Sequence, residues 1–259
     1  MVHGQGQRPS LLMAPLPLVA PRGAAVAVAI DVLRASSTAV VAHGRGAHRV
    51  LVASSLREAR RLRRTFADHL LAGERGGLPP PGFDLGNSPW QALAADLRGR
   101  GLVLTTSNGT RLLRRLAHLP VVLVGCLLNR RAVATVAAAQ ARALGLPVAL
   151  VCAGEAGGRE LALEDVIGAG AIVETLLELG HPLEPDEWAR LALLAFEAAR
   201  RDLPSALAAT RHGRQLAALG LGDDVAYCAR LDEWEVVPRL ERGAEGLLAL
   251  RPCPLPPAR

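Results

Sequence analysis

Residues 26–44, VAVAIDVLRASSTAVVAHG, join an apolar run to a polar turn, and this stretch decides the fold. The run 26–30 shows no alternation of apolar and polar residues, which is typical of a strand covered on both faces of a parallel sheet. Asp31 ends the run, and a helix is predicted to follow it directly. In parallel α/β folds, ligands bind where strand carboxyl ends meet helix amino ends. The stretch therefore predicts a buried strand and a ligand-binding edge.

The polar side chains after this strand predict an anion site. The first turn of a helix offers free N–H groups, and Arg34 can grip phosphate or carboxylate with two parallel donors. Ser36 and Ser37 add hydroxyl groups nearby. The alternative is an ordinary capped helix start, in which Asp31 and the serines only stabilise the turn.

Further apolar runs predict more strands, at 49–53, 101–105, 121–125 and 147–152. Segments of helical length lie between them, at 56–72, 89–97, 109–118 and 129–145. Strands that alternate with helices predict an α/β fold of three layers, α/β/α, with a largely parallel sheet.

The domain organisation is predicted from changes in composition along the chain. Residues 1–22 are expected to be irregular, 23–250 to form a single domain, and 251–259 to be an irregular, proline-rich tail. After about residue 160 the domain is expected to be helix-rich, with helices at 163–180, 186–201, 203–220 and 222–230.

Composition excludes several classes of protein. All 30 basic residues are arginine, so a P-loop lysine and a Schiff-base lysine are both excluded. The net charge of +6 suggests nucleic acid, but aromatic residues make up only 3% of the chain, and the arginines of segment 57–64 are interpreted as a solvated helix face. The four cysteines are scattered, as in a reducing cytoplasm, and the apolar runs are too short to span a membrane. We therefore expect no nucleic-acid partner and no membrane partner.

Four further segments place small and polar residues after a strand or turn. TTSNGTR (105–111) supplies Asn108, Gly109 and Thr110 as an anion cradle, although Asn-Gly is also a common turn. GERGG (73–77) and GFDLGNSP (82–89) supply Glu74, Asp84 and Ser88, with a long connecting turn as the alternative.

The other two segments are GCLLN (125–129) and LED (163–165). Asn129 is a binding candidate, although taken on its own it is better explained as the N-cap of the helix 130–145. Glu164 and Asp165 can supply oxygen ligands to magnesium, or they interact only with the helix dipole.

In this order, DVLRASSTAV (31–40), AGERGG (72–77), GFDLGNSP, TTSNGTR, GCLLN, VCAG (151–154) and LED resemble the 2-phosphosulfolactate phosphatase family. The resemblance spans roughly residues 26–180. It implies an α/β fold, a Mg²⁺ cofactor and hydrolysis of 2-phospho-3-sulfolactate, or a similar phosphorylated small hydroxy acid, to sulfolactate and phosphate within coenzyme M biosynthesis.

The resemblance also implies roles for the candidate residues. Asp31, Glu164 and Asp165 would hold the metal. Catalysis would involve Asp31, Arg34, Glu74 and Asp84, with Glu74 or Asp84 activating water. Substrate would contact Ser36, Ser37, Ser88, Asn108, Gly109, Thr110 and Asn129. The alternative function is a non-catalytic binder of a phosphorylated or sulfonated metabolite, and a homodimer is expected only because symmetric pairs are common.

Overall fold

The computed structural model describes residues 10–20, 23 and 25–256, and within them one sheet runs through the molecule. The strands, in chain order, are β1 (Ser10–Ala14), β2 (Val26–Ile30), β3 (Arg49–Val52), β4 (His69–Gly73), β5 (Gly101–Thr105), β6 (Val121–Gly125), β7 (Val148–Cys152), β8 (Glu184–Pro185), β9 (Val237–Arg242) and β10 (Leu248–Cys253). Their order across the sheet is β4-β5-β3-β10-β9-β6-β2-β7-β1-β8.

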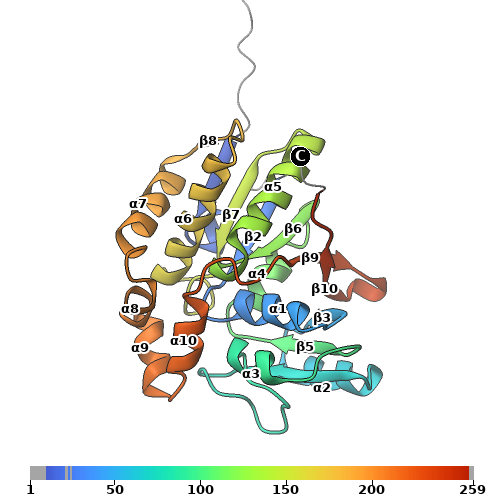
Figure 1. Ribbon diagram of the computed structural model, residues 1–259. Coiled ribbons are helices and arrows are strands. Elements are labelled where there is room, and N and C mark those ends of the chain that lie inside the picture. The colour runs from blue at the N-terminus through green and yellow to red at the C-terminus, as the bar shows by residue number, and fades with distance from the viewer. Residues whose placement is uncertain (1–9, 21–22, 24, 257–259) are drawn as a thin grey trace, which may run out of the picture.

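The helices connect and cover these strands. They are α1 (Ala35–Gly44), α2 (Leu56–Thr65), α3 (Pro89–Ala94), α4 (Gly109–Leu116), α5 (Arg130–Leu144), α6 (Leu163–Glu178), α7 (Glu187–Ala199), α8 (Leu203–Ala208), α9 (Arg211–Ala218) and α10 (Gly222–Cys228). Three short 3-10 helices, at Pro17–Val19, Leu127–Asn129 and Ala244–Gly246, complete the elements. Figure 1 shows α8, α9 and α10 side by side at one edge of the molecule, and α10 also contacts α3.

The predicted α/β fold is confirmed, because helices cover both faces of a mostly parallel sheet. Neighbouring residues of a strand point to opposite faces. Ala29 faces residues of α1 and α4, whereas Val28 lies beside Gly125 together with side chains of α5 and α6. Every residue of β2, β5, β6 and β7 is buried, which explains their continuous apolar runs.

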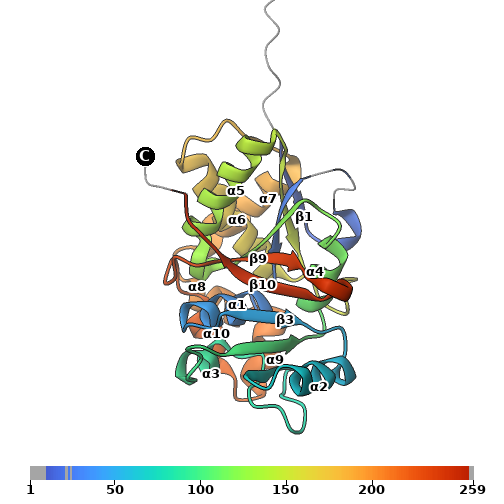
Figure 2. The same ribbon diagram turned by 90° about the vertical axis from the view of Figure 1, so that its right-hand side faces the viewer.

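An antiparallel hairpin, β9–β10, divides the sheet into two parallel halves (Figure 2). The sequence did not predict this hairpin, and the irregular structure expected from residue 251 was wrong as far as Cys253, the end of β10. Irregular structure was also wrong for Ser10–Ala14, which forms β1 and pairs with β7. The expected helix 56–72 ends at Thr65, and β4 follows it. Of the two expected irregular ends, residues 1–9, 21–22 and 257–259 lie outside the described residues.

Two further findings concern the surface and the cysteines. The arginines of α2 at 57, 60, 61 and 64 are exposed, while Ala59 and Leu62 face the core. All four cysteines are free. Among the described residues, no helix has the length and apolar character needed to cross a membrane.

Candidate active site

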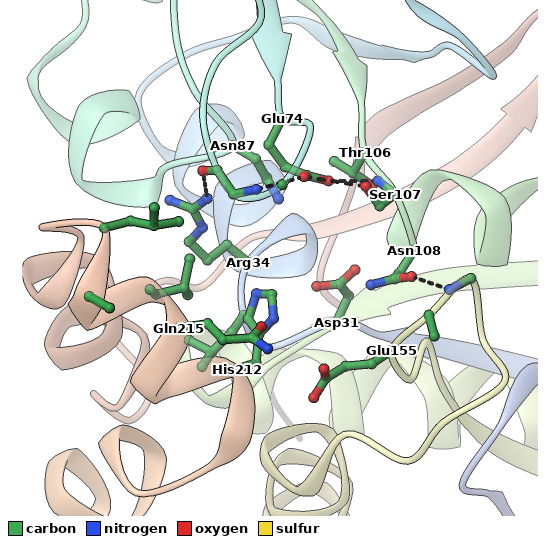
Figure 3. A pocket seen from close by; sticks show the side chains of 18 residues that line it. Asp31, Arg34, Glu74, Asn87, Thr106, Ser107, Asn108, Glu155, His212 and Gln215 are labelled. Atoms are coloured by element: carbon green, nitrogen blue, oxygen red, sulfur yellow. Dashed lines mark hydrogen bonds between the residues drawn. The ribbon is translucent and has the colours of Figure 1, made fainter.

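A cavity of about 510 Å³ opens at the carboxyl ends of β2, β4, β5 and β7. Its walls come from the loops that follow these strands and from α9, which approaches from the helical region (Figure 3). The polar lining residues are Asp31, Arg34, Glu74, Asn87, Thr106, Ser107, Asn108, Glu155, His212 and Gln215. The cavity therefore lies at the edge of the sheet that the sequence predicted for ligand binding.

Asp31 lies buried at the centre of this wall. Its Oδ1 accepts a hydrogen bond from the N–H of Ala35 at 3.0 Å, in the first turn of α1. Burial raises the pKa of Asp31 to about 6, and the nearby Glu74 carboxylate raises it further, while the backbone of Ala35 and Gly109 and the charge of Arg34 oppose the increase. Asp31 can therefore exchange a proton close to neutral pH.

Glu74 is tied to the loop after β5. Its Oε1 accepts from the N–H of Ser107 at 2.6 Å, and its Oε2 accepts from the Ser107 hydroxyl at 3.3 Å and from the N–H of Gly77 at 3.2 Å. Three donors hold the carboxylate in place, so Glu74 fixes the two loops relative to each other at the cavity wall.

Arg34 is buried and points into the same wall. Its Nη1 donates to Oδ2 of Asp224 at 2.6 Å, and its Nη2 donates to the carbonyl of Gly77 at 2.6 Å. Its Nε has no hydrogen-bond partner among the described residues. Arg34 is therefore fixed by α10 and by the 73–77 turn, and its Nε–H stays available to a ligand.

Two asparagines add amide groups to the cavity. Asn108 accepts from the N–H of Gly157 at 2.9 Å through Oδ1, which leaves its NH₂ group free. Asn87 is buried, and its Oδ1 has no partner in the described part of the chain. The sequence prediction had chosen Ser88 within the same GFDLGNSP segment, and the unpaired amide beside it was missed.

Glu155, Glu164 and His212 form a cluster against the cavity, with one ligand atom from each within 4.8 Å of the others. Burial raises the pKa of Glu164 to about 7, and repulsion from Glu155 and Asp31 adds to the increase. The buried Oε2 of Glu164 has no hydrogen-bond partner within the described residues. Mutually repelling carboxylates with an unpaired buried oxygen fit a divalent cation.

Asp165 lies beside this cluster, and each of its carboxylate oxygens accepts one backbone hydrogen bond. Its Oδ1 accepts from the N–H of Val32 at 2.8 Å, and its Oδ2 accepts from the N–H of Gly154 at 3.1 Å. The side chain thus ties the end of β2 to the end of β7. Each oxygen keeps a further lone pair, so the predicted metal role of Asp165 stays a prediction beside this structural role.

Several residues predicted to bind substrate do not line the cavity. The Ser36 hydroxyl bonds to the backbone of Asp31 and Ala29, and the Ser37 hydroxyl donates to the carbonyl of Val32 at 2.8 Å. Thr110 bonds only within its own turn, to Thr106. These hydroxyls form hydrogen bonds to backbone groups of the strand-to-helix turns, as in the alternative of a capped helix start.

Three more residues from the sequence prediction also lie outside the cavity lining: Asn129, Ser88 and Asp84. Asn129 is fully buried and bonds to the backbone of Cys126, Val124 and Val236, so it closes the turn after β6. Ser88 caps α3 and donates to Oδ1 of Asp224 at 2.7 Å. Asp84 is exposed, and its Oδ2 accepts from the N–H of Leu71 at 2.7 Å.

Gly109 contributes through its lack of a side chain. A Cβ at this position would lie 2.5 Å from Oδ2 of Asp31 and 2.5 Å from the Cβ of Ala35. Glycine therefore allows the start of α4 to pack against the Asp31 carboxylate, whose pKa its N–H lowers.

His212 and Gln215 on α9 were missed by sequence reasoning. Neither residue stands in a recognisable motif, and the helix reaches the cavity only through tertiary packing. Glu155 stands three residues after the end of β7, and this position after a strand is the sequence feature that could have identified it.

The sequence model of the family described as 2-phosphosulpholactate phosphatase matches residues 17–243. A protein of Deinococcus radiodurans named probable 2-phosphosulfolactate phosphatase is 43% identical over 219 residues, which are 84% of this chain and 88% of that protein.

Two further relatives carry the same name. The protein of Carboxydothermus hydrogenoformans is 37% identical and aligns over 82% of this chain and 84% of its own length. The protein of Thermus thermophilus is 40% identical and aligns over 85% of this chain and 90% of its own length. The match to residues 17–243 therefore covers the cavity, the helical region and every strand of the sheet except β1 and β10.

Proposed function

The chain belongs to the 2-phosphosulpholactate phosphatase family and is a phosphoric monoester hydrolase, and from this premise we propose that it hydrolyses 2-phospho-3-sulfolactate, or a similar phosphorylated hydroxy acid, in a reaction that depends on Mg²⁺. The products would be sulfolactate and inorganic phosphate, as expected for a step in coenzyme M biosynthesis.

One observation carries the proposal. The cavity is lined by Asp31, Glu155 and His212, and the buried Glu164, whose Oε2 has no partner among the described residues, clusters with the last two. Arg34, whose Nε also has no partner there, and Asn108 line the same cavity. The carboxylates offer oxygen ligands to a hard cation, and the donors offer hydrogen bonds to phosphoryl oxygens. Phosphoryl transfer requires both kinds of group at one point.

Glu155 and Glu164 would hold the metal, with Asp31 facing them. Bound there, Mg²⁺ would neutralise charge on the phosphoryl group and polarise a water molecule. Glu155 is also held by Arg211, whose Nε and Nη2 each lie 3.0 Å from its Oε2. Because imidazole suits Zn²⁺ better than Mg²⁺, His212 at the same cluster makes Zn²⁺ the natural competitor in a metal screen.

The protein's own side chains would orient the substrate and move the proton. Asn108 and the Nε–H of Arg34 would donate to phosphoryl oxygens, and the Glu74–Ser107 connection would keep the Asn108 loop in place. Asp31 lines the cavity and would accept a proton from the attacking water. Asp84 lies outside the cavity, so Asp31 replaces it as the proposed base.

The test measures phosphate release from phosphosulfolactate, 2-phospholactate and phosphoglycolate, with Mg²⁺ and with EDTA. We expect turnover that EDTA abolishes and Mg²⁺ restores, and we expect Asp31→Asn to lose it while Asp84→Asn keeps it. Equal turnover in EDTA, or no release from any of these esters, would contradict the proposal.

Other expectations stay predictions. A titration with DNA and RNA would test the expected lack of nucleic-acid binding, since binding through arginines alone is strongly salt-dependent. Light scattering would test the homodimer, and location in the cytoplasm is a question for imaging in cells.

A further inference from the structure

A second, smaller pocket of about 160 Å³ lies next to the cavity. Asn108 and Gly157 line both spaces, and the hydrogen bond from the N–H of Gly157 to Oδ1 of Asn108 lies between them. The 3-10 helix Pro17–Val19 supplies its opposite wall through Pro17 and Leu18.

The charge of this pocket is opposite to that of the cavity. Arg111, Arg115 and Arg159 line it, and no described acidic residue does. None of the three arginines forms an ion pair or a side-chain hydrogen bond with a described residue. The neighbouring cavity holds Asp31, Glu74 and Glu155, and its only lining arginine is Arg34, which is already paired with Asp224.

A glycine, Gly157, lets the guanidinium of Arg111 pack close to the backbone. Gly157 has a φ of +73°, and a Cβ there would lie 2.8 Å from Nη1 of Arg111. Arg111 and Arg115 are four residues apart on α4, so they project from one face of the helix. The guanidinium of Arg111 is therefore in contact with the residue that separates the two spaces.

The size suits a small anion. A volume of 160 Å³ corresponds to roughly five water molecules. Guanidinium groups bind tetrahedral oxyanions with paired, charge-assisted hydrogen bonds.

We propose that this arginine pocket, defined by Arg111, Arg115 and Arg159, is a second anion site that binds a tetrahedral oxyanion of the sulfonate or phosphate type. The anion comes from one of two sources. It is the sulfonate of a substrate whose phosphate occupies the cavity, or it is a free inorganic anion. The first source rests on the proposed function, whereas anion binding itself does not.

The first experiment measures binding without turnover. Sodium sulfate is titrated by calorimetry into the EDTA-treated chain at constant ionic strength. We expect Arg111→Gln/Arg159→Gln to weaken sulfate binding at least tenfold, and Arg115→Gln to weaken it in a separate variant. Arg114→Gln is the matched control, because it removes the same charge from the same helix outside the pocket. Equal sulfate affinity in all these proteins would overturn the proposal.

The second experiment separates the sources through KM. If the sulfonate of the substrate occupies the pocket, the double variant raises KM for phosphosulfolactate at least tenfold and leaves KM for 2-phospholactate within twofold. If a free anion binds, both KM values stay unchanged while sulfate binding is lost. Failure of wild-type turnover would count against the proposed function, and the sulfate titration would still decide on the pocket.

Discussion

The guanidinium of Arg34 and the carboxylate of Asp224 form a buried ion pair, with 2.6 Å between Nη1 and Oδ2 and only 2% of each side chain exposed. The other oxygen of Asp224 accepts from the hydroxyl of Ser88 at 2.7 Å and from the N–H of Trp90 at 3.1 Å. Asp224 thus joins α10 to the first turns of α1 and α3. The helical region after residue 160 is in this way part of the cavity wall.

Replacing Asp224 with alanine is expected to lower the free energy of unfolding by about 3–5 kcal/mol, because it leaves a buried guanidinium without its partner. Urea unfolding followed by circular dichroism measures the change. Ser88→Ala is the comparison, since it removes one neutral donor to the same carboxylate together with the cap of α3, and it is expected to cost about 2 kcal/mol. Equal losses in the two variants would contradict the assignment of the ion pair as the main contact.

The central strands were predictable because burial on both faces gives a continuous apolar run. Prediction failed where a strand depends on a distant partner. β9, VPRLER, carries charges and a proline, and it is held by pairing with β10 across a turn rather than by an apolar pattern. β4 follows α2 so closely that its leucines could pass for a further helical turn.

The residues of the candidate site also fall into those that the sequence could identify and those that it could not. Asp31, Glu74 and Asn108 could be found from the sequence because each follows a strand that ends at the same edge of the sheet. Ser36 and Thr110 stand in equally suggestive positions, yet their hydroxyls serve the backbone. Sequence position fixes which turn a residue occupies, whereas the direction of its side chain depends on packing. His212 could not be found at all, because only the tertiary fold brings α9 to the cavity.

Glu164→Gln is expected to have opposite effects on stability with and without metal. In the metal-free chain the pKa of Glu164 is raised from 4.5 to about 7, so the folded state binds more protons than the unfolded state between these values. The charged side chain therefore destabilises the fold increasingly as pH rises through this range, and fully above it. At pH 8 in EDTA the variant should be more stable by up to about 3 kcal/mol.

Added Mg²⁺ should reverse this order. Wild type should gain about 2.7 kcal/mol at a hundredfold excess of metal over its Kd, and the variant should gain far less. Melting temperatures with EDTA and with Mg²⁺ measure both effects. Glu178→Gln serves as the control, because Glu178 is half exposed on the same helix, α6, and pairs with Arg131 away from the cluster. An equal Mg²⁺-dependent shift in wild type and Glu164→Gln would remove Glu164 from the metal site.

His43 is expected to make the fold sensitive to acid. The pKa of His43 is lowered from 6.5 to about 4, mainly by burial. The charge of His48 also lowers this pKa, whereas the hydrogen bond to the carbonyl of Ala47 raises it. Between these pH values the unfolded state binds the extra proton, so stability falls as pH falls below 6.5. From pH 7.5 to pH 5 this costs about 2 kcal/mol.

Urea unfolding at pH 7.5 and at pH 5 tests this directly. His43→Gln should lose less stability across the interval than wild type, by about the same 2 kcal/mol. His118→Gln, which changes an exposed histidine, should behave as wild type does. A pH dependence that is identical in all three proteins would show that His43 does not contribute.

Gly109→Ala tests whether the packing of α4 against Asp31 sets the position of the carboxylate. The new methyl group would start 2.5 Å from Oδ2 of Asp31 and from the Cβ of Ala35, so the carboxylate or the helix must move. A displacement of about 1 Å is expected to lower kcat about 100-fold, with a stability loss of about 1–3 kcal/mol. Gly222→Ala is the control, because a Cβ there meets nothing within 4 Å. Normal kcat per folded molecule in Gly109→Ala would mean that Asp31 tolerates displacement, and its assignment as the base would then fail.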